Sequence, residues 1–350
     1  MSKEQGFITD ILPFSVNDGP GIRTTVFFKG CPPRRISQQD ARNRTITECM
    51  GTREMSKEQG FITDILPFSV NDGPGIRTTV FFKGCPLRCI WCHNPETWRR
   101  EPQCMVNASL CVHCGRCAPC PNGARDEAGR WNAARCLSCG RCAAACPTGA
   151  THMCGRRTSV EAVLARVLPD RPFFRTRGGV TLSGGEPMAQ PAFALALARA
   201  FAAQEVRVLV ETCGQAPYED YERILPFVEG FLFDWKETDP EKHRQFTGVD
   251  NARIRENLVR LAEAKTKLTL RCPIIPGYND TQAHFEGIAH LARTLPAIQQ
   301  VDLLPYHALG NSKRAQLAQP PDSILPPTPQ QIAQWHQTLT TLCPVPVHRA

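Results

Sequence analysis

The spacing of its cysteines constrains this chain more than any other feature. The 350 residues include 18 cysteines, and 12 of these lie between Cys85 and Cys146 at short, regular spacings. Thiols grouped in this way, in a chain without signs of secretion, indicate metal ligands rather than disulfides. The N-terminus lacks the basic, apolar and small-residue regions of a signal peptide, and no apolar run reaches the roughly 18 residues of a membrane span. We therefore expect a cytoplasmic protein with no membrane segment.

The first cysteine group is Cys85-Pro-Leu-Arg-Cys89-Ile-Trp-Cys92. Three thiolates on a short loop can hold three irons of a cubane and leave the fourth iron open to another ligand. A zinc site is the alternative, with His93 as its fourth ligand. A protein that only carries electrons has no use for an open iron, so this loop argues against a pure electron-transfer function.

A second group, between residues 104 and 154, matches the cysteine run of bacterial ferredoxins. The downstream copy, ending in Cys146-Pro147, has the full spacing, and the upstream copy, ending in Cys120-Pro121, is one residue shorter. In two-cluster ferredoxins the fourth cysteine of each run binds the other cluster. The predicted ligands are Cys111, Cys114, Cys117 and Cys146 for one [4Fe–4S] cluster, and Cys136, Cys139, Cys142 and Cys120 for the other. Because of the missing residue, Cys104 or Cys154 could replace Cys120, and a pair of zinc sites stays an alternative.

Outside this stretch, strand-like and helix-like patterns alternate from Arg77 to Tyr306. The expected strands are Thr78–Phe82, Val180–Leu182, Val206–Val210, Phe231–Phe233, Lys267–Arg271 and Val301–Leu304. The expected helices are Ser159–Leu168, Pro191–Ala203, Asn251–Ala264, His284–Thr294 and, at the end, Pro329–Leu342. This alternation predicts an α/β fold, a partial (β/α)6 TIM-like barrel built from residues 55–103 and 155–350. Residues 104–154 would form an inserted, bacterial-ferredoxin-like domain.

Polar or special residues follow each expected strand at the same end. In barrels of this kind the chemistry gathers at the carboxyl ends of the strands, so these residues predict one shared site. They are Cys85, Gly184, Gly185, Glu186, Glu211, Thr212, Asp234, Lys236, Arg271 and His307.

Residues 1–32 recur without change as residues 55–86. Only the second copy continues into the Cys85 loop, while the first runs into a polar, arginine-rich tract without clear periodicity. We interpret residues 1–54 as a duplication or gene-model error, non-functional or disordered, with Met55 as the true start. A regulatory N-terminal extension is the alternative.

From Met55 onward the sequence resembles the radical-SAM superfamily, and within it the activating enzymes of glycyl-radical enzymes. The resemblance lies in CPLRCIWCHNPE around Cys85, in the Asp72–Arg77 segment DGPGIR, and in the triplet Gly184-Gly185-Glu186. The cysteine-rich insert resembles the subgroup that carries two additional clusters.

This resemblance implies a role for each residue of the predicted site. Cys85, Cys89 and Cys92 would hold the catalytic [4Fe–4S] cluster, whose open iron is chelated by S-adenosylmethionine (SAM). The residues expected around SAM are Trp91 and His93 on the adenosyl side, Gly184, Gly185 and Glu186 at the methionine amino group, Asp234 and Lys236 near its carboxylate, and Arg271 and His307 around the rest of the pocket. Glu211 and Thr212 stand where the family has a monovalent-cation site, with Glu in place of the usual Asp.

The implied reaction is reductive cleavage of SAM to methionine and a 5′-deoxyadenosyl radical, which takes a hydrogen from a glycine of a partner enzyme. The reductant would be a flavodoxin or ferredoxin, acting through the insert under anaerobic conditions. A radical-SAM enzyme acting on a small molecule or peptide is the alternative. The net charge of +8 suits an acidic protein partner or a solvated surface equally, and we expect no nucleic-acid binding.

Overall fold

The computed structural model describes residues 8–15, 23–28, 58–118, 120–126 and 130–349. The chain divides into two units, Met1–Ser56 and Lys57–Ala350. The larger unit is built on one nine-stranded sheet with the strand order β13-β12-β11-β10-β9-β8-β4-β3-β7.

Seven strands of this sheet run parallel and form its main part. They are β4 (Arg77–Phe82), β8 (Gly179–Gly184), β9 (Val208–Thr212), β10 (Gly230–Asp234), β11 (Lys267–Ile274), β12 (Ile298–Pro305) and β13 (Val347–Arg349). At the other edge, β3 (Gln59–Ser69) pairs antiparallel with β4, and β7 (Arg156–Ser159) pairs antiparallel with β3. An α/β fold with a mainly parallel sheet is therefore confirmed, and all six expected strands belong to it.

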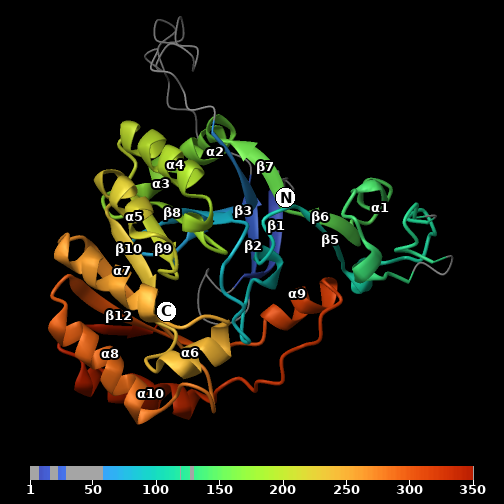
Figure 1. The fold of residues 1–350 in the computed structure, drawn as a ribbon. Coiled ribbons are helices and arrows are strands. Elements are labelled where there is room, and N and C mark those ends of the chain that lie inside the picture. The colour runs from blue at the N-terminus through green and yellow to red at the C-terminus, as the bar shows by residue number, and fades with distance from the viewer. Residues whose placement is uncertain (1–7, 16–22, 29–57, 119, 127–129, 350) are drawn as a thin grey trace, which may run out of the picture. The chain divides into compact units, whose positions relative to one another are not determined.

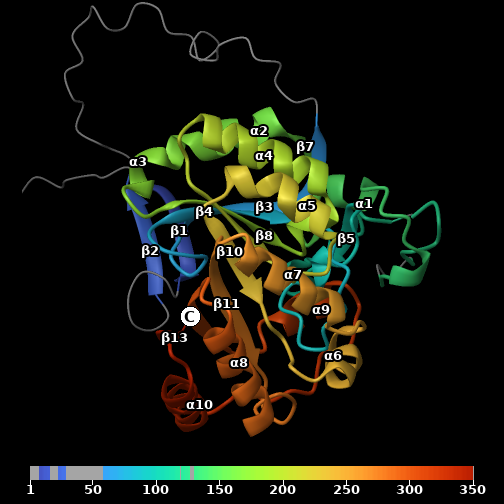
Figure 2. The same ribbon diagram turned by 60° about the vertical axis from the view of Figure 1, so that its left-hand side comes forward.

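Helices link the parallel strands. They are α2 (Val160–Val167), α3 (Arg171–Phe174), α4 (Pro191–Ala203), α5 (Tyr218–Ile224), α6 (Pro240–Thr247), α7 (Ala252–Glu263), α8 (Gln282–Thr294), α9 (Gly310–Gln316) and α10 (Pro329–Leu342). Figures 1 and 2 show α4, α5, α7 and α8 along one side of the sheet. In α7 the residues Ile254, Leu258 and Leu261 are buried, and this helical spacing of apolar side chains is what predicted the element.

Local capping fixes where the helices begin. Ser159 caps α2, Thr281 caps α8, and Thr328 forms a capping box with Gln331 at the start of α10. Pro191, which lacks a backbone N–H, occupies the first turn of α4. No helix in the described residues is long and apolar enough to cross a membrane.

The cysteine-rich stretch contains only short elements. Strands β5 (Gln103–Val106) and β6 (Thr151–Cys154) pair antiparallel at its two ends, and α1 (Arg141–Ala144) lies between them. The pairing of β5 with β6 therefore brings the two boundaries of the insert together, and β5 contacts α9. No helix or strand in the described residues of this stretch is longer than four residues.

In the first copy of the repeat, β1 (Ile8–Ser15) and β2 (Arg23–Phe28) form a separate two-stranded sheet. Its register, with Ile8 opposite Phe28 and Ser15 opposite Arg23, repeats the pairing of β3 with β4. Identical sequences thus form the same hairpin. In the nine-stranded sheet it is the second copy, β4, that pairs with β8. Most of residues 1–54 lie outside the described residues, so the expectation that they are non-functional or disordered stays a prediction.

The segment DGPGIR is held in place by Arg77, which is fully buried. Its guanidinium donates hydrogen bonds to Thr181 Oγ1 (2.7 Å) and to the backbone oxygen of Val180 (2.8 Å). Gly75 has a φ of +76°, and a Cβ there would lie 2.6 Å from the backbone nitrogen of Gly178. The turn before β4 therefore needs glycine and arginine, and it places Asp72 beside the carboxyl ends of the strands.

Candidate active site

A cavity of about 300 Å³ lies at the carboxyl ends of the parallel strands. Most of the predicted site residues line it: Cys85, Cys89, Trp91, Cys92, His93, Gly184, Gly185, Glu211, Thr212, Asp234, Lys236 and Arg271. Glu186 and His307 belong to the same region but do not line this cavity. The structure thus gathers residues from β4, β8, β9, β10 and β11 around one space.

The Cys85–Cys92 loop follows β4 and is clamped on two sides. The backbone amides of Arg88 and Ile90 donate to carbonyl oxygens at the end of α6, at 2.7 and 3.0 Å. From α9, Arg314 donates to the Ile90 carbonyl oxygen at 2.8 Å, and a Cβ at Gly310 would lie 2.5 Å from the Cys92 carbonyl oxygen. The backbone that carries the three thiols is therefore fixed before any ligand binds.

The three thiols of this loop all face the cavity, and burial raises the pKa of Cys89 and, to about 11, that of Cys92. Buried thiols of this kind ionise when a metal supplies positive charge. A tri-cysteine loop beside a cavity with room for a further ligand fits an iron–sulfur cluster with one open iron.

The two glycines after β8 allow the closest backbone approach in the site. Gly184 has a φ of +108°, and the Gly185 amide donates to the Phe82 carbonyl oxygen at 2.9 Å. A Cβ on Gly185 would lie 2.4 Å from the Gly84 carbonyl oxygen. Any larger residue would push the end of β8 away from the start of the cysteine loop.

Glu186 is 1% exposed, and its carboxylate accepts hydrogen bonds from neighbouring protein groups. Its two oxygens accept hydrogen bonds from the backbone amides of Met188 (2.9 Å) and Cys213 (2.7 Å) and from the Thr212 hydroxyl (2.9 Å). Burial raises the pKa of Glu186, and these three hydrogen bonds oppose that shift. The side chain therefore ties the end of β8 to the turn after β9.

Lys236 carries the main positive charge facing the cysteine loop. Its ammonium contacts Asp234 Oδ2 at 2.8 Å. Burial alone would lower the pKa of Lys236. The negative charge of Asp234 and the nearby cysteines raise this pKa by more than burial lowers it, so the side chain stays charged. This leaves a buried cation in position for an anionic ligand group.

The loop that carries Lys236 is held by two buried asparagines. Asn279 donates to the carbonyl oxygens of Lys236 (2.8 Å) and Pro273 (2.7 Å), and Asn251 donates to that of Glu237 (2.9 Å). Both amides are at most 3% exposed. The position of Lys236 is therefore set by side chains outside the cavity, which sequence reasoning did not identify.

Glu211 and Arg271, which both line the cavity, form an ion pair with a nitrogen–oxygen distance of 3.2 Å. The Ser183 hydroxyl also donates to the Glu211 carboxylate. Thr212, next to Glu211, turns its hydroxyl toward Glu186 and Tyr221. The carboxylate expected to hold a monovalent cation is thus already balanced by a guanidinium.

His93 and His307 meet outside the cysteine loop. Their rings stack with centroids 3.6 Å apart and an interplanar angle of 26°. Burial lowers the pKa of His93 to about 3, and His307 adds to this effect, so the stacked pair is uncharged near neutral pH. His307 therefore supports His93 from behind, while Trp91 packs on Phe246 and Tyr278.

Among the further residues that line the cavity and that the sequence analysis did not select are Asp72, Asn94, Cys213 and Tyr306. Cys213 is buried, and the Cys85 thiol beside it raises the pKa of Cys213 well above its usual value. The available signal was its position directly after Glu211-Thr212 at a strand end. Asp72 could have been found from its place in DGPGIR.

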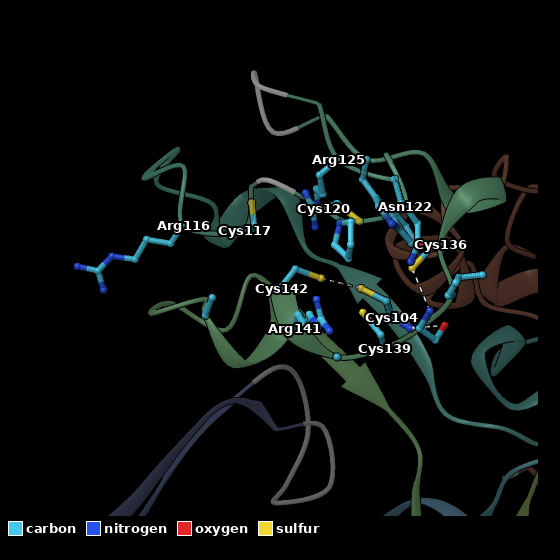
Figure 3. Close-up of a pocket in the computed structure, with 17 residues that line it drawn as sticks. Cys104, Arg116, Cys117, Cys120, Asn122, Arg125, Cys136, Cys139, Arg141 and Cys142 are labelled. Atoms are coloured by element: carbon cyan, nitrogen blue, oxygen red, sulfur yellow. Dashed lines mark hydrogen bonds between the residues drawn. The ribbon is translucent and has the colours of Figure 1, made fainter.

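The insert holds a second group of cysteines around another cavity, of about 210 Å³. Cys104, Cys117, Cys120, Cys136, Cys139 and Cys142 line it (Figure 3). Cys104 and Cys142 point toward each other, with their sulfurs 3.9 Å apart. Cys146 does not line this cavity, whereas Cys117, which is assigned to the same cluster as Cys146, does, so the ligand assignment stays a prediction.

The two Cys-Pro sites of the insert have matching surroundings. The Thr151 backbone amide donates a hydrogen bond to the Cys146 sulfur at 3.4 Å. This amide and those of Thr148 and Ala150 lower the pKa of Cys146 to about 7, and the amides at the same three positions after Cys120 lower the pKa of that thiol. Backbone amides directed at a sulfur are a general feature of iron–sulfur ligation. Cys120 thus has the environment of a ligand despite the shortened run.

Comparison with known proteins gives these sites a family. Residues 79–292 match the radical-SAM superfamily. The chain is 44% identical over 276 residues to an isethionate sulfite-lyase activating enzyme of Oleidesulfovibrio alaskensis, covering 75% of this chain and 89% of that protein. It is 39% identical to a choline trimethylamine-lyase activating enzyme of the same organism (75% and 88% covered) and 41% identical to a benzylsuccinate synthase activating enzyme of Thauera aromatica (72% and 80% covered).

The chain belongs to the radical-SAM family of glycyl-radical-enzyme activating enzymes. The resemblance seen in the sequence is thereby confirmed, and so is its function: the protein activates a glycyl-radical enzyme by radical-SAM chemistry. Family membership also implies SAM and a [4Fe–4S] cluster as cofactors. The tri-cysteine loop and the cavity beside it fit both groups.

Proposed function

We propose that this activating enzyme uses three [4Fe–4S] clusters, one at Cys85, Cys89 and Cys92 and two in the insert, to cleave SAM and form a radical on a glycine of its partner. The observation that carries the proposal is the single cavity shared by the tri-cysteine loop, the Gly184-Gly185 turn and Lys236. SAM bound to the cluster supplies a 5′-deoxyadenosyl radical for hydrogen abstraction from glycine. All other tasks fall to the chain's own residues.

These residues bind, orient and shield. Lys236 would pair with the methionine carboxylate, in exchange for part of its contact with Asp234. Gly184 and Gly185 would let the methionine amino group approach the strand end, with Glu186 bracing that turn from behind. Trp91 and His93 would cover the adenosyl side, with His307 stacked on His93. Arg271 would keep Glu211 neutralised, and a cation at Glu211 and Thr212 would have to compete with that guanidinium.

In the insert, the matched amide environments of Cys120 and Cys146 support the crossed ligand assignment. One cluster would use Cys111, Cys114, Cys117 and Cys146. The other would use Cys136, Cys139, Cys142 and Cys120, and Cys104 would remain a thiol beside Cys142 rather than replace Cys120. This arrangement would make residues 104–154 a two-cluster, ferredoxin-like domain inserted in a partial (β/α)6 barrel formed by residues 55–103 and 155–350.

The partner would be a glycyl-radical enzyme, as the names of the relatives suggest. Those names include lyases for isethionate and for choline, so they support the class of partner more than a particular substrate. The reductant would be a flavodoxin or ferredoxin, and the protein would act in the cytoplasm.

The test is anaerobic reaction of the reconstituted protein with SAM, a reductant and a glycyl-radical enzyme from the same organism. We expect 5′-deoxyadenosine and an electron paramagnetic resonance doublet from a glycyl radical on that partner. Cys89→Ser should abolish both signals, whereas the matched variant Cys343→Ser, in a half-buried thiol outside the cavity, should retain them. Formation of 5′-deoxyadenosine without any radical on the partner would favour a small-molecule or peptide substrate instead.

A further inference from the structure

The side chains of the insert carry more positive than negative charge, and four-thiolate clusters, which are anionic, would balance part of it. Residues 104–154 contain five arginines, no lysine and only two acidic residues, Asp126 and Glu127. Arg125 donates to Thr151 Oγ1 at 2.7 Å, and Arg130 pairs with Asp126 at 2.6 Å. These two guanidinium groups therefore have partners within the insert, Arg125 in its buried part and Arg130 at its surface.

Arg116 and Arg141 are different, because both are exposed and both line the mouth of the cysteine cavity. Within the described part of the chain, neither forms an ion pair with a carboxylate. In Figure 3 the Arg116 side chain extends away from the cysteines toward the outside of the insert. Guanidinium groups are charged at every physiological pH, so this mouth is lasting positive surface.

An exposed apolar residue lies at the same mouth. Leu137 is 71% exposed and lines the cavity together with Arg116 and Arg141. It is directed outward because its neighbours Cys136 and Cys139 face the cavity and because Ser138 adopts a φ of 52°, from which its amide reaches the Cys136 sulfur at 3.4 Å. Cys139 itself is exposed. The sulfur ligands of this cluster therefore approach the protein surface beside Leu137.

We propose that the surface formed by Arg116, Leu137 and Arg141 is the docking site for an acidic one-electron carrier protein. This inference rests on the proposed function, since it requires a cluster at Cys136, Cys139 and Cys142. An apolar centre with a charged rim is the pattern of a small, transient interface, and electron-transfer encounters need little buried area. One electron leaves the carrier and one enters the cluster next to Cys139; no bond forms or breaks.

The test uses the reconstituted holoenzyme and measures 5′-deoxyadenosine against the concentration of a reduced, acidic ferredoxin. The double variant Arg116→Glu, Arg141→Glu should lower the second-order rate with ferredoxin by about tenfold or more and flatten its dependence on salt. The matched control is Arg253→Glu, Arg255→Glu, which makes the same change of charge on exposed positions of α7. This control should behave as the wild type.

Dithionite separates the docking surface from the function itself. The Arg116, Arg141 variant should keep its iron content and its dithionite-driven rate. If the glutamate variant loses its iron or its dithionite-driven rate, the milder double variant Arg116→Gln, Arg141→Gln is measured instead. An unchanged rate with ferredoxin in that glutamine variant refutes the proposed docking site. Equal losses in the α7 control would also overturn it, because net charge alone would then explain the effect. A wild-type protein that fails to cleave SAM with dithionite would instead refute the proposed function.

Discussion

Glu186 offers a sharp test of how the site is built. The family resemblance assigns its carboxylate to the methionine amino group, whereas in the structure both oxygens accept hydrogen bonds from Met188, Thr212 and Cys213. In Glu186→Gln one oxygen becomes an NH2 group. Whichever way the amide turns, that group faces a backbone N–H, either of Met188 or of Cys213. At least one buried donor is then left without an acceptor.

The cost can be estimated from those contacts. An unsatisfied buried N–H costs about 1–3 kcal/mol, and the two opposed donors add to it. Removing a buried negative charge returns part of this cost. We expect a net loss of about 2 kcal/mol, which for a unit spanning Lys57–Ala350 lowers the melting temperature by roughly 3 °C. Because Cys213 lies against Cys85, the affinity for SAM should fall as well.

The assay is anaerobic calorimetry of the reconstituted protein, combined with iron content and SAM binding. Glu205→Gln is the matched control, since that carboxylate is 87% exposed and its ion pair with Arg171 lies on the surface. It should leave the melting temperature unchanged. If Glu186→Gln melts like the wild type, retains its iron and yet no longer binds SAM, Glu186 faces the ligand and the bracing role is wrong.

Three further outcomes are expected. Anaerobic reconstitution should give about twelve irons per chain. Replacing Cys85, Cys89 and Cys92 by alanine should remove about four of these irons and abolish SAM cleavage. A reconstituted protein that holds zinc and little iron would contradict this prediction. A chain starting at Met55 should retain its fold, iron and activity, as measured by circular dichroism, iron analysis and 5′-deoxyadenosine, and halved iron would refute it. Burial lowers the pKa of His284 to about 3, so this imidazole takes up a proton in the unfolded chain, near its usual pKa of about 6.5, but not in the folded one. The free energy of unfolding should therefore fall by about 1.4 kcal/mol between about pH 8 and about pH 5.5. His284→Asn should reduce this pH dependence, as measured by urea unfolding.

The parallel part of the fold was predictable because each of its elements has a local signal. Buried apolar runs mark the central strands, and the pattern at Pro191–Ala203 gives α4 with the same bounds as in the structure. The antiparallel strand β3 was missed for a physical reason. In β3 the buried and exposed positions do not alternate cleanly, and the strand contains Pro67 and, in Phe68, a residue with a φ of 60°. Such a strand is defined by its pairing with β4 rather than by its own pattern.

The site follows the same division between local and distant causes. Residues at strand ends were found because parallel strands bring their carboxyl ends to one place whatever their spacing in the sequence. The residues that hold the site were not, because their partners are far away in the chain: Asn279 binds the loop of Lys236, and α9 clamps the cysteine loop through Arg314. Neither asparagine nor arginine stands out in its own segment. A motif therefore identifies the groups that meet the cofactor, while the groups that fix their geometry become visible only once the chain is folded.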